Sequence, residues 1–325
     1  MMARLKYGLL MSVMLLMSGL AYALDDSKGN SGKCFLWEVR SKTATVYLLG
    51  SFHMFKKEMY PLDKCISTAF DKADTLVVEV NMNTIDQDRT ASLFKERGIY
   101  PGDTTLEQQL SKETLEKLKK YLTRIGADIT QVNKMRPWYL GMTIAVQEMI
   151  ALGYDPDLGI DLFFLANAGA RNILELETIE DQMDILAGDP DEGQDIALRM
   201  ALEDLSDLEM LMDKMVNAWT KGDAEALNDI MREPADRYPL LEQQIKRTID
   251  DRNVDMAGKI SGFLKTGKTY FVIVGGGHIG GKKGLAALLK ARGYTVNQMP
   301  KQAEKVSDNR GMTNLLPITT IALAK

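Results

Sequence analysis

The chain is poor in the side chains on which most enzyme mechanisms depend. It has two histidines and two cysteines among 325 residues. The signatures H-E-x-x-H, G-x-S-x-G and Walker A are all missing, which argues against the common zinc peptidases, the α/β-hydrolases and the P-loop NTPases. Any chemistry must therefore use a small number of residues.

Excess positive charge is also missing. The formal net charge is −5 with a pI near 5.3, and no cluster of lysine and arginine supplies the basic face that a nucleic-acid-binding protein needs. Hydrophobic residues make up 45% and charged residues 26% of the chain, close to ordinary globular values, which excludes disordered, collagen-like and polytopic membrane proteins.

The N-terminal segment, residues 1–23, is typical of an export signal. Arg4 and Lys6 precede an apolar run over residues 7–20, and Ala21-Tyr22-Ala23 offers a small-x-small cleavage site. The run is shorter than the roughly 18 to 20 residues that a membrane span needs, which favours cleavage over a membrane anchor. We expect cleavage near Ala23 and a mature protein, without a transmembrane segment, that is periplasmic or secreted.

The two cysteines, Cys34 and Cys65, both lie in the predicted mature chain. An oxidising compartment favours a disulfide between them, and closing a loop of this length typically contributes about 3 kcal/mol. The alternative, a redox or metal-binding pair, lacks the C-x-x-C spacing. We therefore predict a structural disulfide.

Strand and helix patterns alternate along the mature chain. Apolar and β-branched runs predict strands at residues 35–39, 45–49, 75–80, 172–176, 270–274 and 294–298. Helical spacing dominates residues 62–72, 106–152, 196–265 and 285–292, with Pro137 as a helix start and Gly153 as a stop. These patterns predict an α/β fold with a central mixed sheet, catalytic loops at the carboxyl ends of strands, and a large helical insertion at approximately 104–265. We expect residues 24–325 to form a single domain.

Both histidines follow a predicted buried strand in the pattern G-x-x-H, ending at His53 and His278, and Glu79 ends a third strand. The loop glycines, which permit close backbone approach, are Gly50, Gly275, Gly276 and Gly277. Because open α/β sheets bind ligands at the carboxyl ends of their strands, we expect the three side chains to meet.

Two neutral imidazoles and a carboxylate can bind a divalent metal and leave positions open for water and substrate. The alternative is that one histidine is structural and Glu79 is an ordinary acid at a strand end. A Ser-His-Asp arrangement that uses Ser51 is disfavoured, because this serine precedes His53 by only two residues.

Short motifs along nearly the whole mature chain point to a family. In chain order they are Leu36-Trp37-Glu38-Val39, Val46 to His53, Tyr60-Pro61-Leu62, Ala73 to Val80, Arg136-Pro137-Trp138, Gly159-Ile160-Asp161, Leu176-Glu177 with Gln182, Arg252-Asn253, Val274 to Gly280, Gly284-Leu285 and Gly293-Tyr294. Together they resemble the TraB/GumN family, which is related to the Tiki metalloproteases.

The resemblance implies a single α/β domain and peptide-bond cleavage that depends on a divalent metal, with manganese or cobalt favoured and zinc as an alternative. It also implies that His53, Glu79 and His278 are the metal and catalytic set. Asp161 and Glu177 match motif acids whose roles it leaves unassigned.

We therefore predict an exported, metal-dependent hydrolase that acts as a peptidase on a peptide or protein substrate. In this hypothesis His53 and His278 bind the metal and Glu79 is a ligand or the general base. Asp161 and Glu177 are candidates for a further ligand or for a partner that orients a histidine.

Three questions stay open. Arg252 suits a substrate carboxylate or an oxyanion, and equally a structural ion pair. A haem- or metal-binding protein, with His53 or His278 as axial ligand, is one alternative function, since distant relatives of this fold include haem-binding lipoproteins. A non-catalytic accessory role in polysaccharide export or plasmid transfer is the other, suggested by the family's names.

Overall fold

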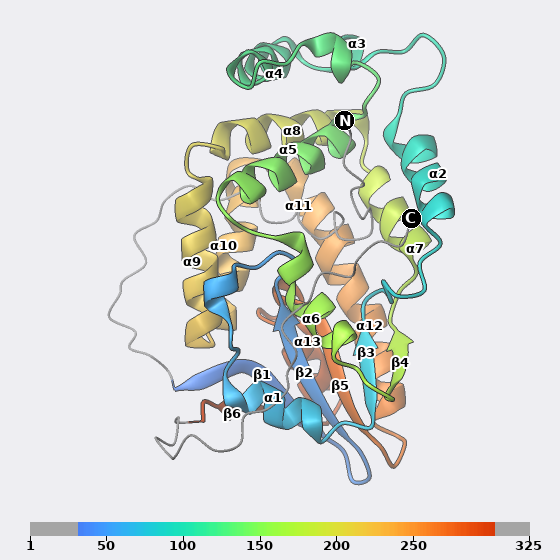
Figure 1. Ribbon diagram of the computed structural model, residues 1–325, viewed down its shortest axis with the longest axis vertical. Coiled ribbons are helices and arrows are strands. Elements are labelled where there is room, and N and C mark those ends of the chain that lie inside the picture. The colour runs from blue at the N-terminus through green and yellow to red at the C-terminus, as the bar shows by residue number, and fades with distance from the viewer. Residues whose placement is uncertain (1–31, 303–325) are drawn as a thin grey trace, which may run out of the picture.

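The fold described here is that of a computed structural model, which describes residues 32–302 (Figure 1). The predicted export signal, residues 1–23, lies outside the described residues. Within the described part, no helix is both long enough and apolar enough to cross a membrane.

Six strands form one mixed sheet within residues 32–302, in the order β4-β3-β5-β2-β1-β6. They are β1 (Lys33–Arg40), β2 (Thr45–Ser51), β3 (Thr75–Val78), β4 (Asn172–Glu175), β5 (Thr269–Gly275) and β6 (Thr295–Pro300). β1 pairs antiparallel with β2 and β6, whereas β2, β5, β3 and β4 run parallel. The predicted α/β class and mixed sheet are confirmed, and β3 ends at Val78, two residues before its predicted end.

Helices make up most of the remaining described chain. They are α1 (Lys64–Asp71), α2 (Gln87–Gly98), α3 (Leu106–Gln109), α4 (Lys112–Arg124), α5 (Pro137–Ala151), α6 (Ile160–Ala166), α7 (Ile179–Ala187), α8 (Asp191–Asp204), α9 (Leu208–Lys221), α10 (Ala224–Arg237), α11 (Leu240–Ile245), α12 (Arg252–Phe263) and α13 (Leu285–Ala291). A π-helix, Lys246–Asp251, joins α11 to α12. As predicted, Pro137 is the first residue of α5, and Gly153 follows that helix with φ at +87°.

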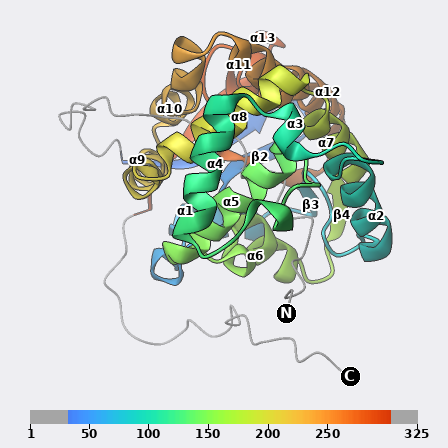
Figure 2. The same ribbon diagram turned by 90° about the horizontal axis from the view of Figure 1, so that it is seen from above.

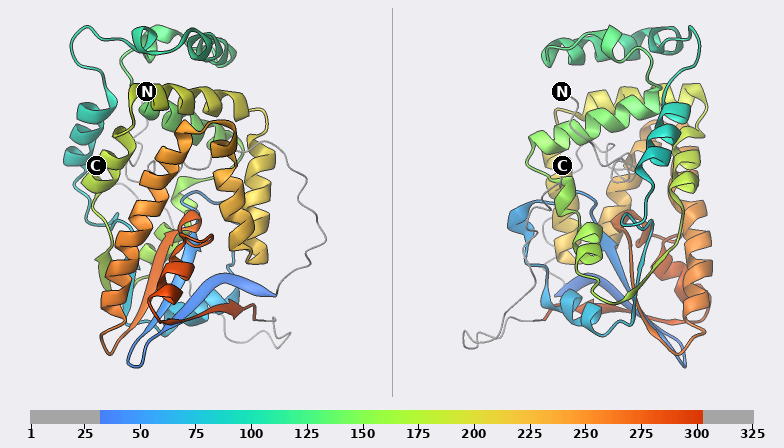
Figure 3. Two further views of the ribbon diagram at one scale, coloured as in Figure 1. Left: turned by 180° about the vertical axis from the view of Figure 1, so that it is seen from behind. Right: turned by 45° about the vertical axis from the view of Figure 1, so that its right-hand side comes forward.

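Most of the helices gather beyond one end of the sheet. Figure 3 shows α5, α8, α9, α10 and α11 above the carboxyl ends of β2 and β5, with α3 and α4 as an outermost pair. Seen from above, this helical layer covers the strand ends (Figure 2). A site at those ends therefore lies between the sheet and the helices.

The core continues from the sheet into this helical layer. The central strands β2 and β5 are buried along nearly their whole length. Met212 and Met215 of α9 are buried in the same apolar cluster as the strands. A smaller cluster of buried side chains, including Leu106, Leu118 and Tyr121, joins α3 and α4 to α5 and α8.

The predicted disulfide between Cys34 and Cys65 is present and joins β1 to α1. Its reduction should lower the free energy of unfolding by about 3 kcal/mol, because the unfolded chain then regains the entropy of an open loop. Urea unfolding with and without dithiothreitol measures the loss. The Cys34→Ser, Cys65→Ser double variant should be insensitive to the reductant, and equal midpoints for the oxidised and reduced protein would contradict the prediction.

Candidate functional site

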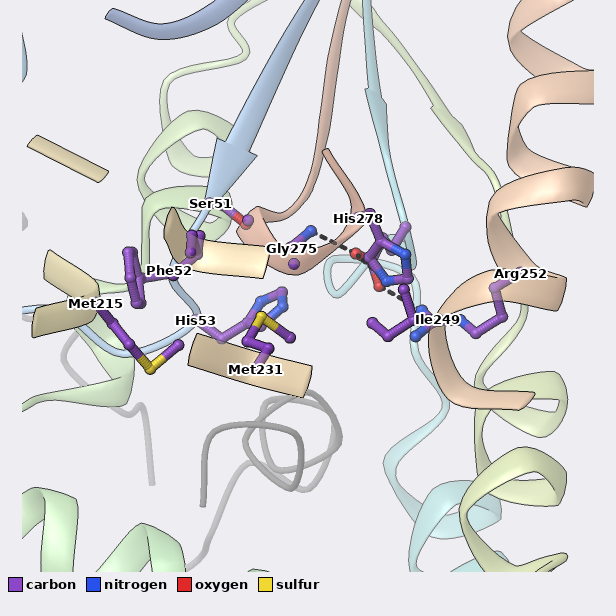
Figure 4. Close-up of a pocket in the computed structure, with 13 residues that line it drawn as sticks. Ser51, Phe52, His53, Met215, Met231, Ile249, Arg252, Gly275 and His278 are labelled. Carbon is purple, nitrogen blue, oxygen red and sulfur yellow. Dashed lines mark hydrogen bonds and ion pairs between the residues drawn. The ribbon is translucent and has the colours of Figure 1, made fainter. Parts of the chain in front are cut away.

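The three predicted ligand side chains line one pocket (Figure 4). His53 lies two residues beyond β2, Glu79 directly follows β3, and His278 lies three residues beyond β5. Because β3, β5 and β2 are parallel neighbours, their carboxyl ends lie side by side. The pocket has an empty volume of about 460 Å³, including open solvent at its mouth.

His53 is oriented by Asp161. Its Nδ1 lies 3.0 Å from Oδ1 of Asp161, and since an ionised carboxylate can only accept, Nδ1–H donates and Nε2 keeps its lone pair. Among the described residues, this buried Nε2 has no hydrogen-bond partner. Burial alone would lower the pKa of His53, but the charge and hydrogen bond of Asp161 outweigh burial and raise it.

A close backbone contact brings Asp161 to the histidine. The amide of Ile160 donates to the carbonyl of Phe52 at 2.9 Å. Gly159 lies so close to the carbonyl of His53 that a Cβ there would overlap it. The glycine before α6 thus lets the start of this helix pack directly on the loop that carries His53.

His278 is oriented by an amide. Its Nδ1 lies 2.7 Å from Oδ1 of Asn253, whose Nδ2 donates to the carbonyl of Lys283 at 2.9 Å. Because that second bond uses the amide nitrogen, the oxygen faces the ring, Nδ1–H donates and Nε2 keeps its lone pair. Burial, followed by the charge of Arg252, lowers the pKa of His278 to about 3, and the ring is therefore neutral near pH 7.

Glu79 belongs to a buried ion cluster. Its Oε1 accepts from the amide of Gly275 at 2.6 Å, and its Oε2 accepts from Arg252 at 2.7 Å and from Gln182 at 3.1 Å. Arg252 also donates through Nε and Nη2 to Glu177. Burial alone would raise the pKa of Glu79, but Arg252, the two imidazoles and the Gly275 amide hold it well below its usual range.

Arg252 is held by several partners in this cluster. The guanidinium is bonded to two carboxylates and to the carbonyl of Thr248, and its side chain is 10% exposed. It is an ion-pair partner within the site rather than a free group for a substrate anion. Glu177, one of the two unassigned acids, lies in this cluster, whereas Asp161 lies against His53.

Gly275 keeps a small space open between the candidate ligands. A Cβ on this glycine would lie 3.4 Å from Nε2 of His53 and 3.4 Å from Oε1 of Glu79. The other loop glycines serve packing, since a Cβ on Gly50 would overlap Phe35 and one on Gly277 would overlap Met231. A Cβ on Gly276 would lie 3.0 Å from Leu227.

The site offers two imidazole nitrogens and a carboxylate to an ion. Nε2 of His278 lies 3.8 Å from Oε1 of Glu79. Within residues 32–302, Cys34, Asp63 and Cys65 form the one trio whose ligand atoms all lie within 4.8 Å of one another, and its two sulfurs are bonded to each other. The ligand atoms of His53, Glu79 and His278 therefore do not all lie within 4.8 Å of one another. Two imidazole nitrogens and a carboxylate are nevertheless donor types that suit a divalent cation.

Asn253 and Gln182 were missed as site residues by sequence reasoning. Both appear in the family motifs, and that is the one signal that could have identified them. Ser51 also lines the pocket, but its buried hydroxyl has no hydrogen-bond partner among the described residues, and so it does not form the serine–histidine bond of a triad.

Comparison with known proteins gives one family and a few distant relatives. The model of the TraB/PrgY/gumN family matches residues 35–298. An uncharacterized protein of Treponema pallidum (strain Nichols) is 24% identical over 61% of this chain and 60% of its own length. Uncharacterized protein YbaP of Escherichia coli (strain K12) is 29% identical over 45% of this chain and 53% of its own. A Metalloprotease TIKI homolog of Amphimedon queenslandica is 22% identical over 82% of this chain and 61% of its own.

The chain thus spans between half and about three-fifths of the length of these relatives. No solved structure matches it.

Proposed function

The chain belongs to the TraB/PrgY/gumN family, and from that premise we propose that it is an exported, divalent-metal-dependent hydrolase that cleaves peptide bonds. The substrate is a peptide or protein in the periplasm or outside the cell. His53 and His278 hold the ion and Glu79 is a further ligand or the general base, with manganese or cobalt preferred to zinc. The similarity to a Metalloprotease TIKI homolog supports the peptidase class.

The observation that carries the proposal is the orientation of the two histidines. Each ring donates from Nδ1 to a side-chain oxygen, of Asp161 in one case and Asn253 in the other, and so each Nε2 is left as an acceptor. Metal-binding histidines typically have such a partner, which selects the tautomer and the ring position. A buried Nε2 without a partner, as in His53, is costly unless a ligand uses it.

The charge balance of the site also favours a cation. Glu79, Glu177 and Asp161 are largely buried carboxylates, and the one guanidinium among them is Arg252. With both imidazoles deprotonated, the form in which they bind a metal, these groups sum to a formal charge of −2. A divalent ion would neutralise this excess, which is otherwise expensive to bury.

A divalent ion held by these residues would polarise the scissile carbonyl and make water a nucleophile near neutral pH. The protein's own groups supply the rest of the mechanism. Glu79 would act as a further ligand or as the general base for the attacking water, and the ion pair with Arg252 keeps it ionised for either role. Asp161 and Asn253 hold the two rings in place, and the helical layer limits the access of bulk water to the pocket.

We also infer that residues 24–325 form a single domain in which the segment 104–265 shapes the pocket. Met215, Leu227, Met231 and Ile249 of that segment line it.

The replacement Glu79→Gln tests the proposal. It should lower kcat/KM for a pool of internally quenched peptides, assayed with Mn²⁺ or Co²⁺, by roughly 100- to 10,000-fold, because the amide cannot accept the proton. Glu116→Gln, at an exposed position on α4, is the matched control and should keep wild-type activity. Absence of hydrolysis by the wild-type protein with any of the metals would overturn the proposal, and a Soret band on haem addition would then favour the haem-binding alternative.

A further inference from the structure

The pocket has a second wall that the proposed hydrolysis does not use. Facing the histidines and Glu79 are apolar side chains from the end of β2, from α9, α10 and the π-helix. They are Phe52, Met215, Leu227, Met231 and Ile249. Figure 4 shows Met215, Met231 and Ile249 on the side of the pocket away from the strand ends. Part of a substrate next to the reacting bond must lie against this wall.

In the metal-loaded site the ion balances the excess of carboxylates, and the charged groups of the protein that line the pocket are paired with each other. In the described chain these are Glu79 and Arg252, which are paired with each other, and Arg252 is also paired with Glu177. The fully buried side-chain atoms of the lining that lack a hydrogen-bond partner there are the hydroxyl of Ser51 and Nε2 of His53. A charged substrate side chain placed in the pocket would therefore lose its water without gaining a counter-ion, at a large cost in free energy.

Met231 is placed to set the depth of the pocket at this wall. It is partly buried on α10, and a Cβ on Gly277 would overlap its Cε, so its thioether lies directly over the loop that carries His278. Methionine is unbranched and adapts its shape to a partner. Its partial exposure also means that it can be replaced without opening the core, unlike the buried Met215.

We propose that Phe52, Met215, Leu227, Met231 and Ile249 form a subsite for one neutral, apolar side chain that flanks the cleaved peptide bond, with Met231 controlling its size. This inference rests on the proposed function of the same site. It narrows the substrate class to peptides with an aliphatic or aromatic residue beside the scissile bond, and it excludes acidic or basic residues at that position.

The first test measures cleavage of internally quenched peptides by the metal-loaded protein. The peptides differ only in the residue that flanks the cleaved bond. Peptides with Leu should exceed those with Asp or Lys by roughly 100-fold in kcat/KM. Met231→Ala should raise the ratio of Phe to Leu by about 10-fold, because the subsite becomes deeper. Met210→Ala, at a 40% exposed position on α9, is the matched control and should leave the ratio unchanged.

A second readout does not depend on hydrolysis. Methionine methyl groups labelled with ¹³C report contacts by NMR, and comparison with Met231→Ala assigns the Met231 signal. Adding acetyl-Gly-Gly-Leu-Gly-Gly-amide to the metal-free protein should shift the Met231 signal and leave that of Met210 unchanged. The same peptide with Asp in place of Leu should shift neither.

The outcomes separate the two proposals. Cleavage with equal rates for Leu, Asp and Lys peptides, or a side-chain preference that Met231→Ala leaves unaltered, would overturn the subsite and keep the hydrolase. A Met231 shift specific to the Leu peptide without any hydrolysis would keep the subsite and overturn the hydrolase. Neither cleavage nor a shift would overturn both.

Discussion

Replacing His53 and His278 together with alanine should reduce the bound divalent metal from about one ion per chain to none. The two rings supply the nitrogen ligands of the proposed site, and their Nε2 atoms are left as acceptors by the bonds to Asp161 and Asn253. The remaining carboxylate, Glu79, is held by Arg252 and the Gly275 amide and cannot retain an ion alone. Elemental analysis after loading with Mn²⁺, Co²⁺ or Zn²⁺ and desalting measures the loss.

Because the chain has two histidines, the double variant has none, and any residual metal must come from other ligands. The single variants should each lose at least 10- to 100-fold in affinity, the loss typical of an altered ligand environment. Unaltered far-UV circular dichroism would show that the helices persist. Equal metal content in wild type and double variant would contradict the site, and no metal in either would favour a binding or accessory role.

The candidate ligands could be predicted because each one is a local feature of the chain. His53, Glu79 and His278 each follow a short apolar strand within three residues. Parallel strands bring their carboxyl ends to one edge, so that a one-dimensional pattern becomes a three-dimensional cluster. The disulfide could be predicted on a different ground, because Cys34 and Cys65 are the two cysteines of the chain and an oxidising compartment favours their pairing.

The residues that support these ligands could not be predicted in this way. Asp161 is 108 residues from His53 along the chain, and Asn253 is 25 residues from His278. Asp161 lies in the first turn of α6, where polar side chains are common for reasons of capping alone, and Asn253 lies where the π-helix continues into α12. Asp161 was a candidate through the family motif alone, and the packing of α6 and α12 onto the strand ends is what brings both residues to the histidines.

The helices α2, α6 and α7 were also missed, for a related reason. The sequence of α2 is mostly polar, and its buried apolar side chains are Leu93 and Phe94. Such a short stripe gives little periodicity, and the helix depends on its Asp86 cap and on packing against α7. The export signal and the single domain remain predictions.

Replacing Arg252 with methionine should destabilise the protein by about 3 to 5 kcal/mol, the largest loss that we expect from one substitution in the site. Methionine preserves the length of the side chain but removes the charge that Glu79 and Glu177 share. Both carboxylates would remain buried without a counter-ion, which costs far more than the intact pair contributes. Urea unfolding at pH 7 of the metal-free protein measures the change.

Two further variants show whether the uncompensated charge is the cause. Adding Glu177→Gln to Arg252→Met removes one of the two orphaned carboxylates, and it should recover part of the loss rather than add to it. Arg40→Met is the matched control, because its partner Glu38 forms an ion pair with an arginine side chain that is 59% exposed. That variant should lose about 1 kcal/mol or less. A similarly small loss in Arg252→Met would mean that solvent reaches the cluster, and the low pKa of Glu79 would then need another source than the buried guanidinium.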